Sequence, residues 1–122
     1  MITGIVTAGR EAIIRLKVRG PNGRWRQFDA VVDTGFDGWL CLPSPMIAQL
    51  GLPWCRRGRA QLADGSECVF DIFEGTALWH RRAQRITVDE ADTMPLVGMA
   101  LLHGSRLEME IRAGGKVILK RL

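Results

Sequence analysis

The sequence predicts a mostly β fold that contains one or two short helices. Apolar and charged residues alternate along 14–19, which is the period-two pattern of a half-buried strand. Asp64-Gly65 lies between two strand-like runs and is a strong hairpin signal. Apolar runs at 31–32 and 96–97 each lead directly into a turn that contains glycine. Short strands and frequent turns of this kind are typical of the all-β class.

Length and composition are those of a small globular protein. The chain has 122 residues, a mass of 13.6 kDa, 47% hydrophobic residues and 25% charged residues, so we expect a single domain over 1–122. No segment approaches the roughly 20 apolar residues of a membrane span. The start at 1–6 lacks the features of a signal peptide. We therefore expect no membrane partner and a cytoplasmic location.

Cysteine and histidine are few and widely spaced. Cys41, Cys55 and Cys68 form no C-x-x-C pair, and His80 and His103 stand alone. This pattern favours reduced thiols over a disulfide framework or a metal site. We expect neither a cofactor nor a metal.

The chain is moderately basic, with a net charge of +4. Two arginine clusters stand out in the sequence: Arg56, Arg57 and Arg59, then Arg81, Arg82 and Arg85. Such clusters can bind nucleic acid, but they are also ordinary solvated surface. No RNA-binding motif with interleaved aromatic residues accompanies them.

The first half reads as a hairpin followed by a short helix. Residues 14–18 and 24–32 are strand-like and flank the turn residues at 20–23, and a strand at 2–6 can pair beside them. Within 43–51, Ser44 can cap a short helix or a single helical turn, with Pro45 at its first position and Gly51 at its end.

The next stretch reads as hairpins joined by an acidic loop. A hairpin over 59–70 turns at Asp64-Gly65, and further strands are expected at 70–78 and 85–88. Asp89, Glu90 and Asp92 then form an acidic connection, most simply a solvated loop.

The C-terminal part repeats the pattern of an apolar run that leads into glycine. Leu96-Val97-Gly98 leads into a brief helical segment that stops at Gly104. Alternation at 107–111 and the returning run at 116–119 predict a final hairpin. That hairpin could either complete a barrel or contribute to a sheet between subunits.

Asp33-Thr34-Gly35 is the most informative stretch of the chain. A carboxylate that directly follows an apolar strand has apolar side chains on one side and polar surroundings on the other. Its pKa can be tuned in such a position. The Thr hydroxyl can bond neighbouring backbone, and Gly allows a tight turn. Taken alone, the tripeptide fits a plain turn aspartate equally well.

This stretch resembles the active-site motif of the retropepsin-like (retroviral-type, clan AA) aspartic proteases, in which two hydrophobic residues precede Asp-Thr-Gly. The following Phe36 is similar to an Asp-Thr-Gly-Phe subgroup, and Leu96-Val97-Gly98 is similar to the family's second motif. The resemblance spans roughly 12–112. It implies a closed barrel with one or two short helices that forms a homodimer.

The resemblance also implies an activity, aspartic endopeptidase, and a set of site residues. Asp33 would be catalytic, in a dyad completed by a second copy of the chain. Thr34 and Gly35 would form the active-site loop, and a peptide or protein would be the substrate. The residues expected to contact that substrate are Phe36, Asp37, and the flap tip Ala63, Asp64, Gly65 and Ser66. Asp37 could instead cap a turn, and the flap could be an ordinary hairpin.

Two further functions stay open. Phe36 is bulky where many family members have a small residue, and Met99-Ala100 replaces a position that is often polar. Both departures fit a catalytically inactive dimer that binds peptides or partner proteins. The other alternative is a basic β-barrel that binds nucleic acid through the arginine clusters.

Overall fold

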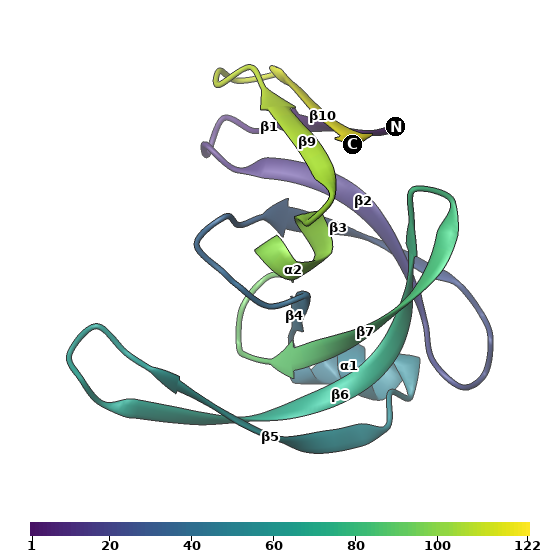
Figure 1. Ribbon diagram of the computed structural model, residues 1–122, viewed down its shortest axis with the longest axis vertical. Coiled ribbons are helices and arrows are strands. Elements are labelled where there is room, and N and C mark those ends of the chain that lie inside the picture. The colour runs from purple at the N-terminus through teal and green to yellow at the C-terminus, as the bar shows by residue number, and fades with distance from the viewer.

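The computed structural model describes residues 1–122 and consists mostly of β-strands (Figure 1). Ten strands and two helices follow one another along the chain: β1 (Ile2–Val6), β2 (Ala12–Arg19), β3 (Arg26–Val32), β4 (Leu40–Leu42), α1 (Ser44–Leu50), β5 (Trp54–Gln61), β6 (Glu67–Trp79), β7 (Arg82–Glu90), β8 (Leu96–Val97), α2 (Met99–Leu102), β9 (Ser105–Met109) and β10 (Lys116–Arg121). The strands form one sheet in the order β5-β6-β7-β4-β8-β3-β2-β1-β10-β9, and β6 also pairs with β2.

The predicted N-terminal hairpin is confirmed. β2 and β3 pair antiparallel, with Leu16 opposite Phe28, and β1 pairs with β2 on its other side. Gly23 closes the turn with a φ of +76°, a backbone conformation that glycine adopts without steric cost. Alternate residues of β2 are buried, as the period-two pattern predicts.

The short helix expected within 43–51 is also confirmed, as α1 (Ser44–Leu50), but its cap differs from the prediction. Pro43 is the N-cap residue, and Ser44 is already inside the helix and makes no capping hydrogen bond. The extended φ and ψ of Pro43 fit the N-cap position, which displaces the expected start by one residue. Gly51 ends the helix in the left-handed conformation, as expected.

The middle of the chain forms a long three-strand meander. The sequence suggested separate strands before and after residue 70, but β6 runs without interruption for 13 residues. It pairs with β5 on one edge and with β7 on the other. The outer part of the β5–β6 hairpin extends away from the body of the molecule (Figure 1).

The two ends of the chain lie side by side (Figure 1). β10 pairs antiparallel with β1 on one edge and with β9 on the other. The predicted final hairpin is therefore present, although β9 ends at Met109 and leaves Ile111 outside the strand.

The core lies between the faces of this curved sheet and the two helices. It contains 19 buried residues from nearly every strand and both helices. No buried residue is polar or charged. None of the helices is long and apolar enough to span a membrane.

Candidate active site

Asp33 lies directly after β3, where the strand runs parallel to β8. Val31 is opposite Leu96 and Val32 is opposite Val97 in this short parallel pair. The backbone N–H of Asp33 donates to the carbonyl oxygen of Val97 at 2.9 Å. The two motifs that the sequence places 65 residues apart, at Asp33 and Gly98, are therefore neighbours in space.

The turn that follows holds the Asp33 carboxylate. Its Oδ1 accepts a hydrogen bond from the backbone N–H of Gly35 at 2.9 Å, and the backbone N–H of Phe36 donates to the Asp33 carbonyl at 3.2 Å. Asp33 is half-buried, whereas Thr34 and Gly35 are exposed. A hydrogen bond to one carboxylate oxygen fixes the side chain while the group stays accessible to solvent.

Residues 36–39 are fixed to the start of α2 by three backbone hydrogen bonds. Gly98 donates to Trp39 at 3.1 Å, Met99 donates to Phe36 at 2.8 Å, and Ala100 donates to Gly38 at 3.1 Å. These bonds are made by backbone groups near the N-terminus of α2, which have no partner inside the helix. The loop that carries Asp33 is thus held at both ends.

Close packing at Gly98 leaves no space for a side chain. A Cβ atom there would overlap the carbonyl oxygen of Gly38 and touch the ring of Phe36, and a Cβ on Gly38 would meet the same ring. The Phe36 ring therefore lies against both glycines. This contact explains the bulky residue at position 36 as part of the packing of the loop.

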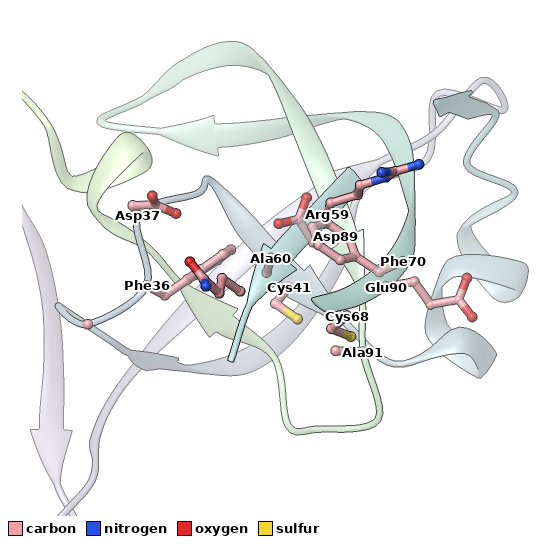
Figure 2. Close-up of a pocket in the computed structure, with 12 residues that line it drawn as sticks. Phe36, Asp37, Cys41, Arg59, Ala60, Cys68, Phe70, Asp89, Glu90 and Ala91 are labelled. Atoms are coloured by element: carbon pink, nitrogen blue, oxygen red, sulfur yellow. The ribbon is translucent and has the colours of Figure 1, made fainter. Parts of the chain in front are cut away.

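A cavity of about 670 Å³ opens between this loop and the β5–β6 hairpin (Figure 2). Its lining comes from the loop, from β4, from both strands of the hairpin and from the end of β7: Gly35, Phe36, Asp37, Cys41, Arg59, Ala60, Gln61, Cys68, Phe70, Asp89, Glu90 and Ala91. The cavity thus lies between the loop that follows Asp33 and the inner part of the hairpin.

The end of β7 corrects the expectation of a solvated acidic loop. Asp89 and Glu90 belong to the strand and pair in parallel with Cys41 and Leu42 of β4. Burial raises the pKa of the Asp89 carboxyl; Arg56 opposes this shift and Asp37 adds to it. Because Asp89 lines the cavity, it brings to this site a carboxyl group that sequence reasoning assigned to a loop.

Cys41 is a second cavity residue that the sequence did not single out. Burial raises the pKa of its thiol to about 11, with further contributions from Asp89 and Asp33. The thiol is therefore protonated at neutral pH and behaves as a small apolar group.

The structure brings together only part of the predicted site. Gly35, Phe36 and Asp37 line the cavity. Asp33 and Thr34 are not among its lining residues, and neither are the tip residues Ala63, Asp64, Gly65 and Ser66. The inner part of the hairpin, not its tip, borders the cavity. Alternation along β5 and β6 could have indicated Ala60 and Cys68, which share a face with Phe70. It could not have indicated Arg59 and Gln61, which also line the cavity.

The arginine clusters lie on β5 and around the β6–β7 turn. Arg57, Arg59 and Arg85 form exposed ion pairs with Asp71, Glu67 and Glu74. Half of the six arginines thus have a carboxylate partner, which lowers the positive potential that each cluster offers to a polyanion.

The histidines and acidic residues do not gather into a metal-binding group: no three His, Cys, Asp or Glu side chains lie together in a suitable arrangement. The Nε2 atom of His80 lies 2.8 Å from the Ser105 hydroxyl, at the turn between β6 and β7. His80 therefore connects that turn to β9, away from the cavity.

Comparison with known proteins gives a likeness of fold. No protein-family model matches the chain, and no curated protein sequence matches it. Among solved structures, it is similar to the crystal structure of a retropepsin-like aspartic protease from Rickettsia conorii, with a TM-score of 0.63 and 16% identity over 99% of this chain and 90% of that one. The retropepsin-like part of the expected fold is thereby confirmed. The Asp-Thr-Gly-Phe subgroup stays a prediction.

Proposed function

We propose that the protein is an aspartic endopeptidase whose active site is completed by a second copy of the chain. The observation that carries this proposal is the position of Asp33, on a loop held by Val97 and α2 whose next residues, 35–37, line a cavity bordered by the β5–β6 hairpin. The likeness of fold to a retropepsin-like aspartic protease supports it.

The chemistry requires two carboxyl groups in different protonation states. One ionised carboxylate takes a proton from water as the water oxygen attacks the peptide carbonyl. The other, protonated, carboxyl donates its proton to the carbonyl oxygen. Collapse of the tetrahedral intermediate breaks the C–N bond. The carboxyl that took the proton from water donates it to the leaving nitrogen, and a hydroxyl of the intermediate returns a proton to the other carboxylate, which restores the starting pair. Two adjacent carboxyls share one proton because both cannot ionise together, as is known for aspartic proteases in general.

Each chain contributes one Asp33, so the proposal requires a homodimer with a twofold axis between the two loops. Thr34 is exposed beside Asp33 and can hydrogen-bond across that axis. Gly35 and Asp37 border the cavity and would approach the backbone of an extended peptide. The hairpin of each chain would close over this peptide and exclude water.

The test compares wild type with Asp33→Asn in a peptide-library digest read by mass spectrometry between about pH 4 and 7. Wild type should cleave, with activity falling as pH rises and the shared proton is lost, whereas Asp33→Asn should stay folded and inactive. Asp29→Asn is the matched control, because Asp29 lies on the same strand in an exposed ion pair with Arg15. Equal cleavage by wild type and Asp33→Asn would exclude the mechanism. Peptide binding without cleavage would point to an inactive binding dimer.

A further inference from the structure

The cavity beside the loop that follows Asp33 combines apolar walls with a wide opening along the hairpin. Half of its twelve lining residues are hydrophobic. It adjoins a second hollow of about 470 Å³, with which it shares Cys68, Phe70, Glu90 and Ala91. Together the two hollows follow β6, and a peptide in an extended conformation could lie along them.

The charged residues of this cavity are mostly acidic. Asp37, Asp89 and Glu90 line it, and Arg59 is the one basic residue of the lining. Arg59 already has a carboxylate partner, Glu67, at 3.8 Å. None of the three acidic residues takes part in any of the five ion pairs of the structure. The cavity therefore presents negative charge that the chain itself does not neutralise.

Asp89 is the carboxylate that faces the loop after Asp33. A Cβ atom on Gly38 would lie 3.3 Å from Oδ2 of Asp89, so this oxygen lies beside the residue that follows Asp37. Successive side chains of a strand point to opposite faces, and in Figure 2 the Glu90 carboxylate is directed away from Asp37. Asp89 is thus better placed than Glu90 to bind a group that enters the cavity from the loop side.

The half-buried Asp89 carboxylate has no cation in contact with it. Burial raises its pKa because the ionised form loses water, and Asp37 adds to this rise. Arg56 opposes the rise but forms no ion pair with Asp89; its Nη1 atom lies 3.5 Å from the Cys55 sulfur. A cationic group of a bound molecule would offset the cost of this partly buried charge.

We infer that Asp89 selects a lysine or arginine side chain of the peptide substrate in this cavity. Such a side chain has a long aliphatic stem and a charged end. The stem would pack against the rings of Phe36 and Phe70, and the charged end would form a charge-assisted hydrogen bond with Asp89. This inference rests on the proposed function, because it names the substrate class of the same site.

The first experiment identifies peptides that the site binds, without any need for cleavage. Immobilised Asp33→Asn protein captures peptides from a library of random octapeptides at pH 7.5, and mass spectrometry reads the captured sequences. Lysine and arginine should be enriched at a fixed position relative to the captured apolar residues. A captured set without basic enrichment, or no capture at all, would overturn the inference.

The second experiment assigns the preference to Asp89. Each captured sequence is made as a fluorescent pair, with either the basic residue or norleucine, which keeps the aliphatic stem and lacks the charge. Fluorescence anisotropy should show that Asp33→Asn binds the basic peptide roughly tenfold more tightly than the norleucine peptide. Adding Asp89→Asn should remove this difference and leave binding of the norleucine peptide unchanged. Adding Asp29→Asn, at an exposed carboxylate outside the cavity, is the matched control and should preserve the difference.

Two further results would overturn the inference. One is a preference that Asp37→Asn abolishes and Asp89→Asn does not. The other is equal loss of both peptides in Asp89→Asn, which would give Asp89 a structural role. The two proposals can fail separately: selective binding without cleavage by wild type would overturn only the proposed function, and Asp33-dependent cleavage without a basic preference would overturn only the inference.

Discussion

The backbone N–H of Asp33 donates to the carbonyl oxygen of Val97 at 2.9 Å, across the parallel pair of β3 and β8. This bond joins the two halves of the chain at the point where the proposed catalytic carboxylate leaves its strand. Its geometry depends on close packing between residues 36–38 and Gly98. The position of Asp33 is therefore set by contacts distant in sequence. A substitution at Gly98 should alter that position.

Gly98→Ala should destabilise the protein by about 1–3 kcal/mol, because the added methyl group overlaps the Gly38 carbonyl and the loop must shift. Urea unfolding measures this change. Gly9→Ala is the control, since its Cβ would meet only the Thr7 hydroxyl oxygen at an ordinary 3.6 Å. Equal stability of Gly98→Ala and wild type would show that the loop is not held as tightly as described.

Asp89→Asn should stabilise the protein at neutral pH. Burial raises the pKa of Asp89 above its ordinary 3.8, so the folded chain holds this proton to higher pH than the unfolded chain does. Stability then falls as pH rises from about 3.8 through the folded pKa. The asparagine variant lacks this loss.

Thermal unfolding between about pH 3.5 and 7 checks the effect of Asp89. The advantage of Asp89→Asn should be largest at pH 7 and should vanish below the unfolded pKa. Asp29→Asn, at an exposed carboxylate, is the comparison. An advantage that does not vary with pH would contradict the assignment to the titration of Asp89.

Asp64→Ala should loosen the tip of the β5–β6 hairpin without unfolding the protein. Asp64 Oδ1 accepts hydrogen bonds from the Ser66 hydroxyl at 2.6 Å and the Ser66 backbone N–H at 2.9 Å, and these bonds lower the pKa of Asp64. Amide hydrogen exchange at Leu62 and Gly65, whose N–H groups bond across the turn, should become faster. Asp64→Asn keeps an acceptor and should change exchange less. Unaltered exchange in the alanine variant would argue against this turn.

Cys41 should react with alkylating reagents far more slowly than Cys68. The pKa of Cys41 is raised to about 11, so its thiolate fraction at pH 8 is only about one in a thousand, and the side chain is also buried. Cys68 is exposed on β6. Mass spectrometry of partially labelled protein distinguishes the sites, and unfolding in urea should remove the difference. Equal labelling of both thiols in the native protein would contradict the burial of Cys41.

The local sequence pattern was sufficient to predict most of the strands and helices. Alternation predicted β2, turn residues predicted the hairpin at Asp64-Gly65, and proline and glycine bounded α1. These signals depend on the period of a strand or helix and on the backbone conformations that a turn needs, so they are present in a short stretch of sequence. The Asp-Thr-Gly stretch likewise made Asp33 the leading candidate for a catalytic residue, a role that stays a prediction.

The tertiary structure decided which distant residues meet. The acidity of Asp89 suggested a solvated loop, yet pairing of β7 with β4 places it beside Cys41 at the cavity. No local pattern reveals that partner. The sequence did not show which strands the final hairpin pairs with. In the structure, β10 pairs with both β1 and β9, and the outer edge of β9 has no partner strand. Strand order and burial determine which residues line the cavity and which strand edge is free. Both depend on packing of the whole chain, so a short stretch of sequence does not reveal them.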